Sequence, residues 1–170
     1  MLVRDQNYLA LDLELNKDDQ DNLTKIIQVG VAVGNPTRPD DIKTWSWYLD
    51  PCESIHPFII GLTGIDDNLI KERAVLLSQV ADELSQVIRD NNVFVNPLQW
   101  GVGDADQLLK EFRDANIHFP HFGRRVMDVK TLFVFLEMAN GRSPAGGLSS
   151  SMGRYKVKFQ GDAHRADVDA

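Results

Sequence analysis

The first half of the chain alternates hydrophobic and polar residues in short runs that predict β-strands. In residues 7–15, NYLALDLEL, four leucines fall on one face, while an alanine and two acids fall on the other. The runs at 25–34 and 43–50 are rich in β-branched and aromatic residues and are separated by the turn-forming sequence NPTRPDD. We therefore expect three consecutive strands that form an antiparallel meander.

Helical periodicity replaces this alternation in the second half of the chain. Apolar residues recur at steps of three and four across 70–89, 104–115 and 128–139, which predicts three amphipathic helices. The run VFVN at 93–96 predicts a short buried strand between the first two of them. Because no internal repeat, low-complexity tract or linker divides the sequence, we expect one α/β domain over residues 1–170.

Composition and charge restrict the class of protein. The single cysteine, Cys52, excludes an intrachain disulfide framework. No stretch approaches the roughly 20 apolar residues of a membrane helix, and the first residues do not resemble a signal peptide, so we expect a soluble, cytoplasmic protein. The formal net charge of -7 argues against nucleic-acid binding. However, acids prevail over residues 1–24 and bases over 142–165, which suits an enzyme that holds cations beside a phosphate.

Asp12 and Glu14 are the first candidates for chemistry. They lie two residues apart on a predicted strand, so both carboxylates project from the same face. Two like charges side by side destabilise a sheet unless a positive charge lies between them, and Mg²⁺ and Mn²⁺ prefer carboxylate oxygen. For a D-x-E pair taken alone, a solvent-exposed strand face is the commoner explanation.

Three segments, taken in order along the chain, point to a specific family. DLE at 12–14, WGVGD at 100–104 and HRADVD at 164–169 resemble the three exonuclease motifs of the DEDDh family, also called DnaQ-like. The resemblance extends to IIQVGVAV after the first motif, to LTGI at 62–65, and to the F-x-G-D-x-H spacing before the last motif. It implies a ribonuclease-H-like mixed sheet, in which parallel strands join the meander and helices flank the sheet.

The resemblance also implies a reaction and its cofactors. Family members are 3′–5′ exonucleases, so we expect release of nucleoside 5′-monophosphates from the 3′ end of single-stranded DNA or RNA. Two divalent cations, Mg²⁺ or Mn²⁺, would lie about 4 Å apart and clamp the attacking and leaving oxygens. Carried over by position, the metal-coordinating acids are Asp12, Glu14, Asp104 and Asp169. Asp12 would bridge both ions, Glu14 and Asp169 would hold the ion of the attacking water, and Asp104 would hold the other.

His164 matches the histidine that takes the proton from water, because H-x-x-x-x-D distinguishes this branch from the one with tyrosine. Five residues of helix correspond to a rotation of about 500°, so we expect His164 in the loop or first turn before the helix that carries Asp169. Asp106 and Asp167 lie two residues from a candidate ligand and must point elsewhere, which makes both candidates for solvated acids. With one residue after Asp169, this helix should fray, or the chain belongs to a longer protein.

The same resemblance places several residues near the terminal nucleotide. Those next to the expected sugar and base are Leu15, Asn16, His56, Phe58 and Leu62. Core packing explains Phe58 and Leu62 equally well. The basic residues Arg154, Lys156 and Lys158 fit either a contact with the upstream strand or a solvated strand face.

Two alternatives stay open. Within the enzyme class, WG-x-x-D slightly resembles the RNA-trimming branch, but the sequence does not separate an exoribonuclease from a DNA exonuclease. Outside it, the domain is an inactive ribonuclease-H-like relative that binds nucleic acid or protein without cutting, although retention of all five motif residues argues against this. The sequence also leaves open a homodimer and a polymerase or replication partner.

Overall fold

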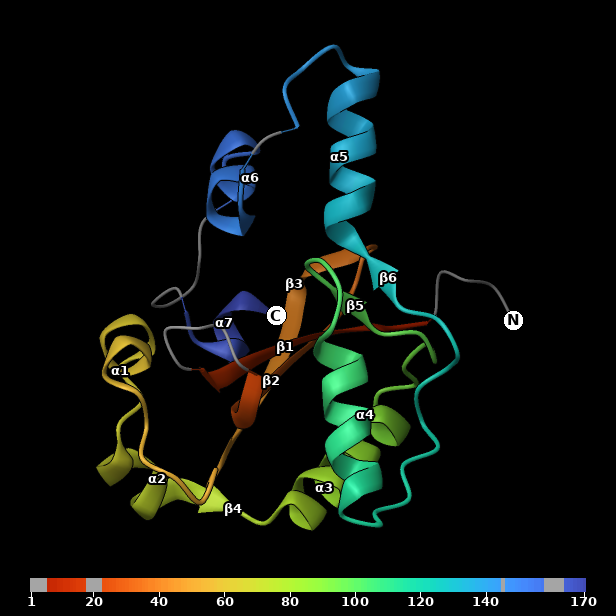
Figure 1. Ribbon diagram of the computed structural model, residues 1–170. Coiled ribbons are helices and arrows are strands. Elements are labelled where there is room, and N and C mark those ends of the chain that lie inside the picture. Colours follow the sequence, from red (N-terminus) through yellow and green to blue (C-terminus); the bar gives the residue numbers. More distant parts are fainter. Residues whose placement is uncertain (1–5, 18–22, 145, 158–163) are drawn as a thin grey trace.

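A central mixed sheet organises the protein (Figure 1). The computed structural model describes residues 6–17, 23–144, 146–157 and 164–170. The long strands form the predicted antiparallel meander: β1 (Tyr8–Lys17), β2 (Leu23–Asn35) and β3 (Arg38–Leu49). Short strands extend the sheet in parallel: β4 (Ala74–Val75), β5 (Leu98–Gln99) and β6 (Met127–Asp128). The order β4-β3-β2-β1-β5-β6 confirms the mixed sheet that the motifs implied.

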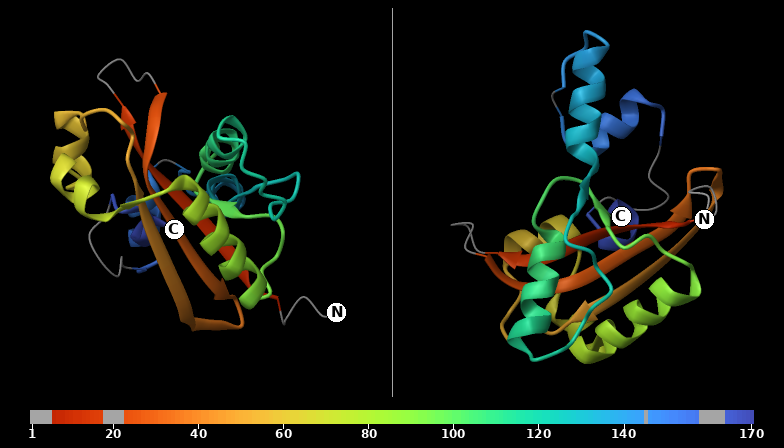
Figure 2. Two further views of the ribbon diagram at one scale, coloured as in Figure 1. Left: turned by 90° about the horizontal axis from the view of Figure 1, so that it is seen from below. Right: turned by 90° about the vertical axis from the view of Figure 1, so that its right-hand side faces the viewer.

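Helices lie on both faces of this sheet and beyond its edge. In chain order they are α1 (Pro57–Thr63), α2 (Asp67–Arg73), α3 (Leu77–Asp90), α4 (Asp104–Asp114), α5 (Val129–Ala139), α6 (Leu148–Arg154) and α7 (Ala166–Asp169). The helices α3 and α4 cover one face, and α7 lies on the opposite face (Figure 2). The helix α5 leaves the sheet at β6 and projects away from it, with α6 beside it. Within the described ranges, no helix is long and apolar enough to cross a membrane.

The leucine face of β1 lies in the main core. Leu9, Leu11 and Leu13 are buried in one cluster with Leu84 of α3 and Phe112 of α4. The alternation predicted for β1 is therefore confirmed through Leu13, and it leaves the acids of this strand on the face that α7 approaches. A register shift between Glu14 and Leu15 ends it, so Leu15 is only partly buried and Asn16 is buried. A second, smaller cluster packs α1 and α2 beside the sheet, and its buried members are Ile27, Ile55, Ile59, Ile65 and Ile70.

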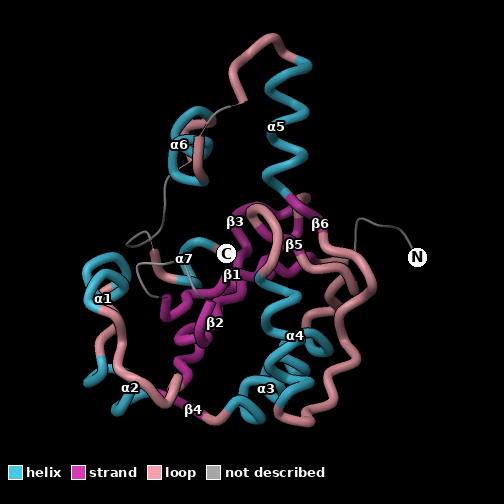
Figure 3. Tube along the Cα trace, viewed as in Figure 1, coloured by secondary structure: helices cyan, strands magenta, loops and turns pink. Residues whose placement is uncertain are grey.

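The continuous helix predicted over 70–89 is wrong. The chain instead forms α2, then the short strand β4, then α3 (Figure 3). Ala74 is extended, with φ −63° and ψ 138°, and it pairs with Tyr48 of β3. Pairing with the edge of β3 thus replaces one helical turn. The apolar periodicity continues through the break because Ile70 packs in the smaller cluster and Leu77 packs against the main core.

The buried strand predicted at 93–96 is also wrong. Only Val93 pairs, through an isolated bridge to Asn7, and Val95 is 52% exposed. Pro97 has no N–H to donate, so the run is interrupted before the chain pairs with β1 again. The strand that joins the sheet is β5, where Leu98 pairs with Ala10.

The helix predicted over 128–139 is confirmed as α5, but most of its large apolar residues face outward. The exposed ones are Leu132, Phe135, Leu136 and Met138. In contrast, Glu137 is fully buried and accepts hydrogen bonds from Arg142, Arg154 and Tyr155. We call these four residues the Glu137 clip. It joins α5 to α6, so Arg142 and Arg154 are bound within the chain, and Lys158 lies outside the described residues.

Candidate metal centre

Asp12 and Glu14 project from the same face of β1, as their spacing predicts. Across the strand pair, Asp12 lies opposite Gly30 and Glu14 lies opposite Gln28 of β2. Both acids are only partly accessible to solvent. Because the leucines of β1 fill the other face, the two carboxylates are held on a rigid strand rather than on a loop.

The helix α7 brings a third carboxylate to this face. A Cβ on Gly30 would lie 2.0 Å from the carbonyl carbon of Ala166, so the helix packs directly on a glycine. Ala166 is completely buried in this contact. As a result, ligand oxygens of Asp12, Glu14 and Asp169 all lie within 4.8 Å of one another.

Asp104 reaches the same site from α4. It is the first residue of that helix and follows Gly103, whose φ of 120° suits glycine. Buried Gln99 fixes the preceding loop, because its amide donates to the carbonyl of Gly101 and accepts from the N–H of Ala105. Asp104 lies outside the closest group of three, but its charge raises the pKa of both Asp12 and Glu14. The structure thus brings together all four predicted acids.

Burial and mutual repulsion make these acids difficult to ionise. Burial, followed by the charges of Asp104, Glu14 and Asp169, raises the pKa of Asp12 to about 8. Burial, with Asp169 and Asp104, raises the pKa of Glu14 to about 7, although Lys17 opposes the shift. Burial likewise raises the pKa of Asp104 to about 6. At neutral pH the cluster therefore favours a bound positive charge, since a cation stabilises the ionised carboxylates.

The two carboxylate oxygens of Asp169 indicate whether this site suits a cation. Its Oδ1 is buried and has no hydrogen-bond partner among the described residues, while its Oδ2 accepts from the N–H of His164 at 3.2 Å. Burial raises the pKa of Asp169, and the hydrogen bond from His164 opposes that shift. An unpartnered buried oxygen is unfavourable unless something binds it. A set of carboxylate oxygens of this kind suits Mg²⁺ or Mn²⁺.

His164 lies immediately ahead of α7, where the sequence predicted it. It is exposed and adopts a φ of 64°, so the chain turns sharply before the helix begins. Its backbone N–H, not its ring, makes the bond to Asp169. The segment 158–163, which contains most of the F-x-G-D-x-H spacing, lies outside the described residues.

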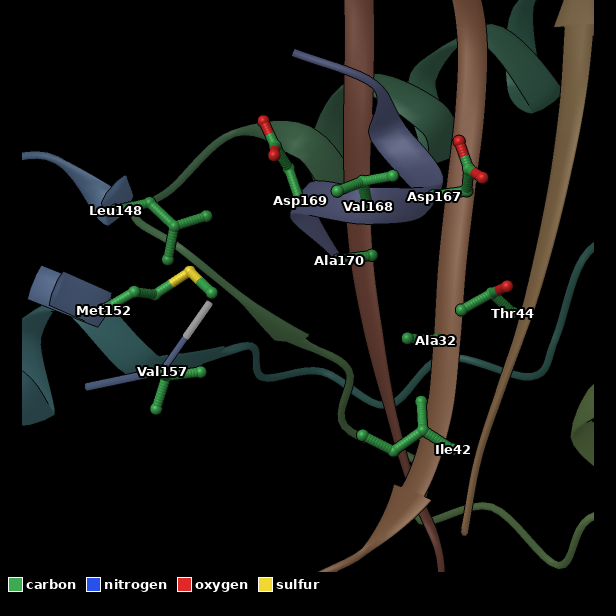
Figure 4. Close-up of a pocket in the computed structure, with 10 residues that line it drawn as sticks. All are labelled: Ala32, Ile42, Thr44, Leu148, Met152, Val157, Asp167, Val168, Asp169 and Ala170. Carbon is green, nitrogen blue, oxygen red and sulfur yellow. The ribbon is translucent and has the colours of Figure 1, made fainter. Parts of the chain in front are cut away.

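The two neighbouring acids behave differently from each other. Asp106 is exposed, as predicted. The side chain of Asp167 is only 18% exposed, so the prediction that it is solvated is wrong. It accepts a hydrogen bond from Gln28 at 3.3 Å and pairs with Arg165 at 3.4 Å, because β2 lies directly beneath it. Figure 4 shows that Asp167 and Asp169 point to different sides of α7, beside a cavity of about 420 Å³.

The residues predicted near the terminal nucleotide lie near the end of β1, just before α1 and within α1. The amide of Asn16 is buried, donates to Glu53 and Ser54, and accepts from the N–H of His56. It therefore holds the chain before α1 against β1, and its contact with substrate stays a prediction. Leu15 packs partly against the main core.

Within α1, core packing does not explain the two apolar candidates. Phe58 is 64% exposed and Leu62 is 40% exposed, one helical turn apart. His56 caps the helix, because its ring accepts from the N–H of Phe58. The helix thus presents an exposed apolar surface at the same end of β1 as Asn16.

Sequence reasoning missed Gln28 and Gly30. Both lie in IIQVGVAV, and both contact the backbone of Ala166 at the start of α7. The available signal was a polar amide inside an otherwise apolar run. Such a residue needs hydrogen-bond partners once it is buried, and here two of its three partners come from the far end of the chain.

Comparisons with known proteins agree with this fold. The family model RNase_T, described as an exonuclease, matches residues 9–170. The chain therefore belongs to this exonuclease family, which confirms the family predicted from the motifs. A comparison with curated proteins gave no match.

Solved structures share the fold at low sequence identity. The nuclease domain of 3′hExo, a DEDDh family member bound to rAMP, has a TM-score of 0.78 and 15% identity, over 96% of this chain and 86% of that one. Cell-death related nuclease 4 (CRN-4) has a TM-score of 0.81 and 18% identity, over 96% of this chain and 60% of that one. A 3′-exonuclease that recognises the histone mRNA stem-loop has a TM-score of 0.78 and 15% identity, over 96% and 76%.

Proposed function

We propose that the chain acts as one exonuclease domain that removes nucleotides from the 3′ end of single-stranded nucleic acid and releases nucleoside 5′-monophosphates. The observation that carries this proposal is the convergence of Asp12, Glu14 and Asp169 within 4.8 Å, with a buried oxygen of Asp169 that has no hydrogen-bond partner among the described residues. Membership of the exonuclease family supports it.

Two divalent cations, Mg²⁺ or Mn²⁺, are the proposed cofactors. When bound, such ions activate water and neutralise negative charge on the phosphate. The grouping of Asp12, Glu14 and Asp169, with Asp104 outside it, supports the roles expected from the motifs. Glu14 and Asp169 would hold one ion, Asp104 would hold the other, and Asp12 would contribute to both.

His164 is proposed to accept the proton of the attacking water. It is exposed, and the bond from its own N–H to Asp169 keeps the residue next to the acid cluster. As the water oxygen bonds to phosphorus, the bond to the 3′-oxygen of the preceding nucleotide breaks, and the water proton moves to the imidazole. The departing 3′-oxygen keeps the bonding electron pair and takes a proton from solvent. The products are a nucleoside 5′-monophosphate and a strand one nucleotide shorter.

Phe58 and Leu62 are proposed to contact the terminal base. Both side chains are exposed on α1 and form an apolar surface on which any of the bases can stack or pack. Asn16 fixes the position of that surface relative to β1, through its bonds to residues 53–56. This arrangement would bind the last nucleotide without specificity for its base.

RNA is the proposed substrate, with DNA as the alternative. The neighbours that favour RNA are the nuclease domain bound to rAMP and the exonuclease that recognises a histone mRNA stem-loop. The test is digestion of 5′-labelled single-stranded RNA and DNA of matched sequence, with Mn²⁺, with Mg²⁺ and with chelator. A ladder that shortens from the 3′ end, and release of 5′-monophosphates identified by mass spectrometry, are the expected results.

Asp104→Ala should reduce the rate at least about a hundredfold, since even residues that only support a metal ligand cost 10–100-fold. Asp106→Ala is the matched control, because Asp106 lies on the same helix and is exposed. If the parent protein binds the oligomers but releases no nucleotide with any of these ions, the inactive binding domain is the better assignment.

A further inference from the structure

Gln28 is a fully buried amide in the middle of the apolar strand β2. It lies opposite Glu14 in the strand pair and on the same face of the sheet as the acid cluster. A buried amide is unfavourable unless its hydrogen-bonding groups are satisfied. Its partners therefore indicate why a polar residue lies at this position.

The amide connects three separate elements. Its Nε2 donates to Ser46 Oγ of β3 at 2.8 Å and to Asp167 Oδ1 of α7 at 3.3 Å. Its Oε1 accepts from the backbone N–H of Ala166 at 3.1 Å. Both contacts with α7 thus come from one side chain.

The helix α7 depends on such contacts because it has only four residues. Helices this short are not stable alone, and their first N–H groups lack partners within the helix. Gln28 accepts one of these groups, and Gly30 leaves room for the backbone of Ala166. These contacts oppose the fraying that the sequence predicts, so the position of Asp169 is set from β2.

We infer that Gln28 is a positioning residue of the metal centre: it docks α7 on the sheet and thereby sets the carboxylate of Asp169 beside Asp12 and Glu14. The inference rests on the proposed function, but it concerns cation affinity before it concerns catalysis. Gln28 touches no ligand oxygen of the cluster in the hydrogen bonds described. It acts through the two contacts with α7.

The first test replaces the amide with an apolar side chain of similar length, Gln28→Met. We expect Mn²⁺ binding, measured by calorimetry, to weaken about 10–100-fold, which is the usual loss when a residue supporting a metal ligand is removed. Backbone amide exchange of Val168 and Asp169, whose N–H groups bond to Arg165, should become faster. Ser46→Ala is the control, because it removes the bond to β3 and leaves both contacts with α7.

The second test reverses the direction of one hydrogen bond. In Gln28→Glu the new carboxylate still accepts from Ala166 but repels Asp167, so Mn²⁺ affinity should fall. Adding Asp167→Asn supplies an amide donor that faces the new carboxylate, and affinity should recover most of the loss. Asp167→Asn alone keeps an acceptor for Gln28 and should lose less than Gln28→Glu. Melting temperatures in chelator establish that each variant is folded.

The inference is overturned if Gln28→Met binds Mn²⁺ as tightly as the parent, or if the double variant is no better than Gln28→Glu. Neither measurement requires nucleic acid to be cut. If the parent binds Mn²⁺ but releases no nucleotide, the proposed function fails while the role of Gln28 is still decided by these affinities. If Gln28→Met does not fold, the comparison of Gln28→Glu with the double variant that adds Asp167→Asn decides the question alone.

Discussion

Two carboxylate sites in this protein have pKa values that are shifted in opposite directions. In the metal centre, burial and the charges of neighbouring acids raise the pKa of Asp12 to about 8. In the Glu137 clip, hydrogen bonds from Arg142, Arg154 and Tyr155 lower the pKa of Glu137 to about 2, although burial opposes this. The difference shows that hydrogen bonds from cationic groups can outweigh the effect of burial on the protonation state of an acid.

The comparison also separates two structural roles. The clip is complete within the chain, because two arginines supply the positive charge, and it joins α6 to the projecting helix α5. In the metal centre, acids from β1, α4 and α7 converge on one another. A site of this kind gains stability from an added cation. Its role is therefore to bind a cation rather than to stabilise the fold.

The largest effect is expected from removing the central acid. Asp12→Asn deletes a ligand oxygen and part of the repulsion, so nuclease activity should fall at least about a hundredfold. In chelator the variant should melt at the same temperature as the parent or higher. A clear fall in melting temperature would show that Asp12 is structural, and would make the metal centre resemble the clip.

Gly30→Ala tests how closely α7 must approach the sheet. The added Cβ would lie 2.0 Å from Ala166, so the helix must shift, with an expected loss of about 1–3 kcal/mol in the free energy of unfolding and weaker Mn²⁺ binding. Gly153→Ala is the matched control in α6, where a Cβ meets nothing within 4 Å. The control should gain about 0.5–1 kcal/mol. Equal effects of the two substitutions, measured by urea unfolding, would contradict this account.

Glu137→Gln tests the clip. Loss of the charge leaves Arg142 and Arg154 without their shared acidic partner, so α5 and α6 should separate more often. We expect faster tryptic cleavage after these two arginines and a melting temperature lower by a few degrees, with Mn²⁺ affinity retained. Unchanged protease resistance would mean that aromatic contacts, such as that between Phe133 and Tyr155, hold the two helices without the charge.

The most general effect concerns pH. The pKa of Asp12 is raised to about 8 and that of Glu14 to about 7, so the folded, cation-free protein holds more protons than the unfolded chain. Proton binding by Asp12 and Glu14 therefore stabilises the folded state fully below the ordinary carboxyl pKa. This stabilisation is lost as pH rises through the raised pKa values. In chelator the melting temperature should fall from roughly pH 5 to roughly pH 8, and excess Mn²⁺ should reduce or abolish the fall. A rise over this window in chelator would refute the assignment.

Local patterns predicted what depends on neighbours in sequence. The alternating leucines of β1 determined both the strand and the shared face of Asp12 and Glu14. The prediction of Asp104, Asp169 and His164 as site residues depended on the family motifs, because residues far apart in sequence come together only in the folded chain. The break at Ala74 was not predictable from periodicity, since residues before and after it face different apolar clusters. The role of Gln28 depends on a helix that comes 138 residues later.

The segment from His164 to Asp169 carries both the proposed proton acceptor and a proposed cation ligand, and the backbone N–H of His164 donates a hydrogen bond to the carboxylate of Asp169. A disturbance that lifts this segment removes base and ligand in one step, so the proposed activity would be either present or lost, without a half-active form. Substitutions at the two residues should accordingly be far from additive.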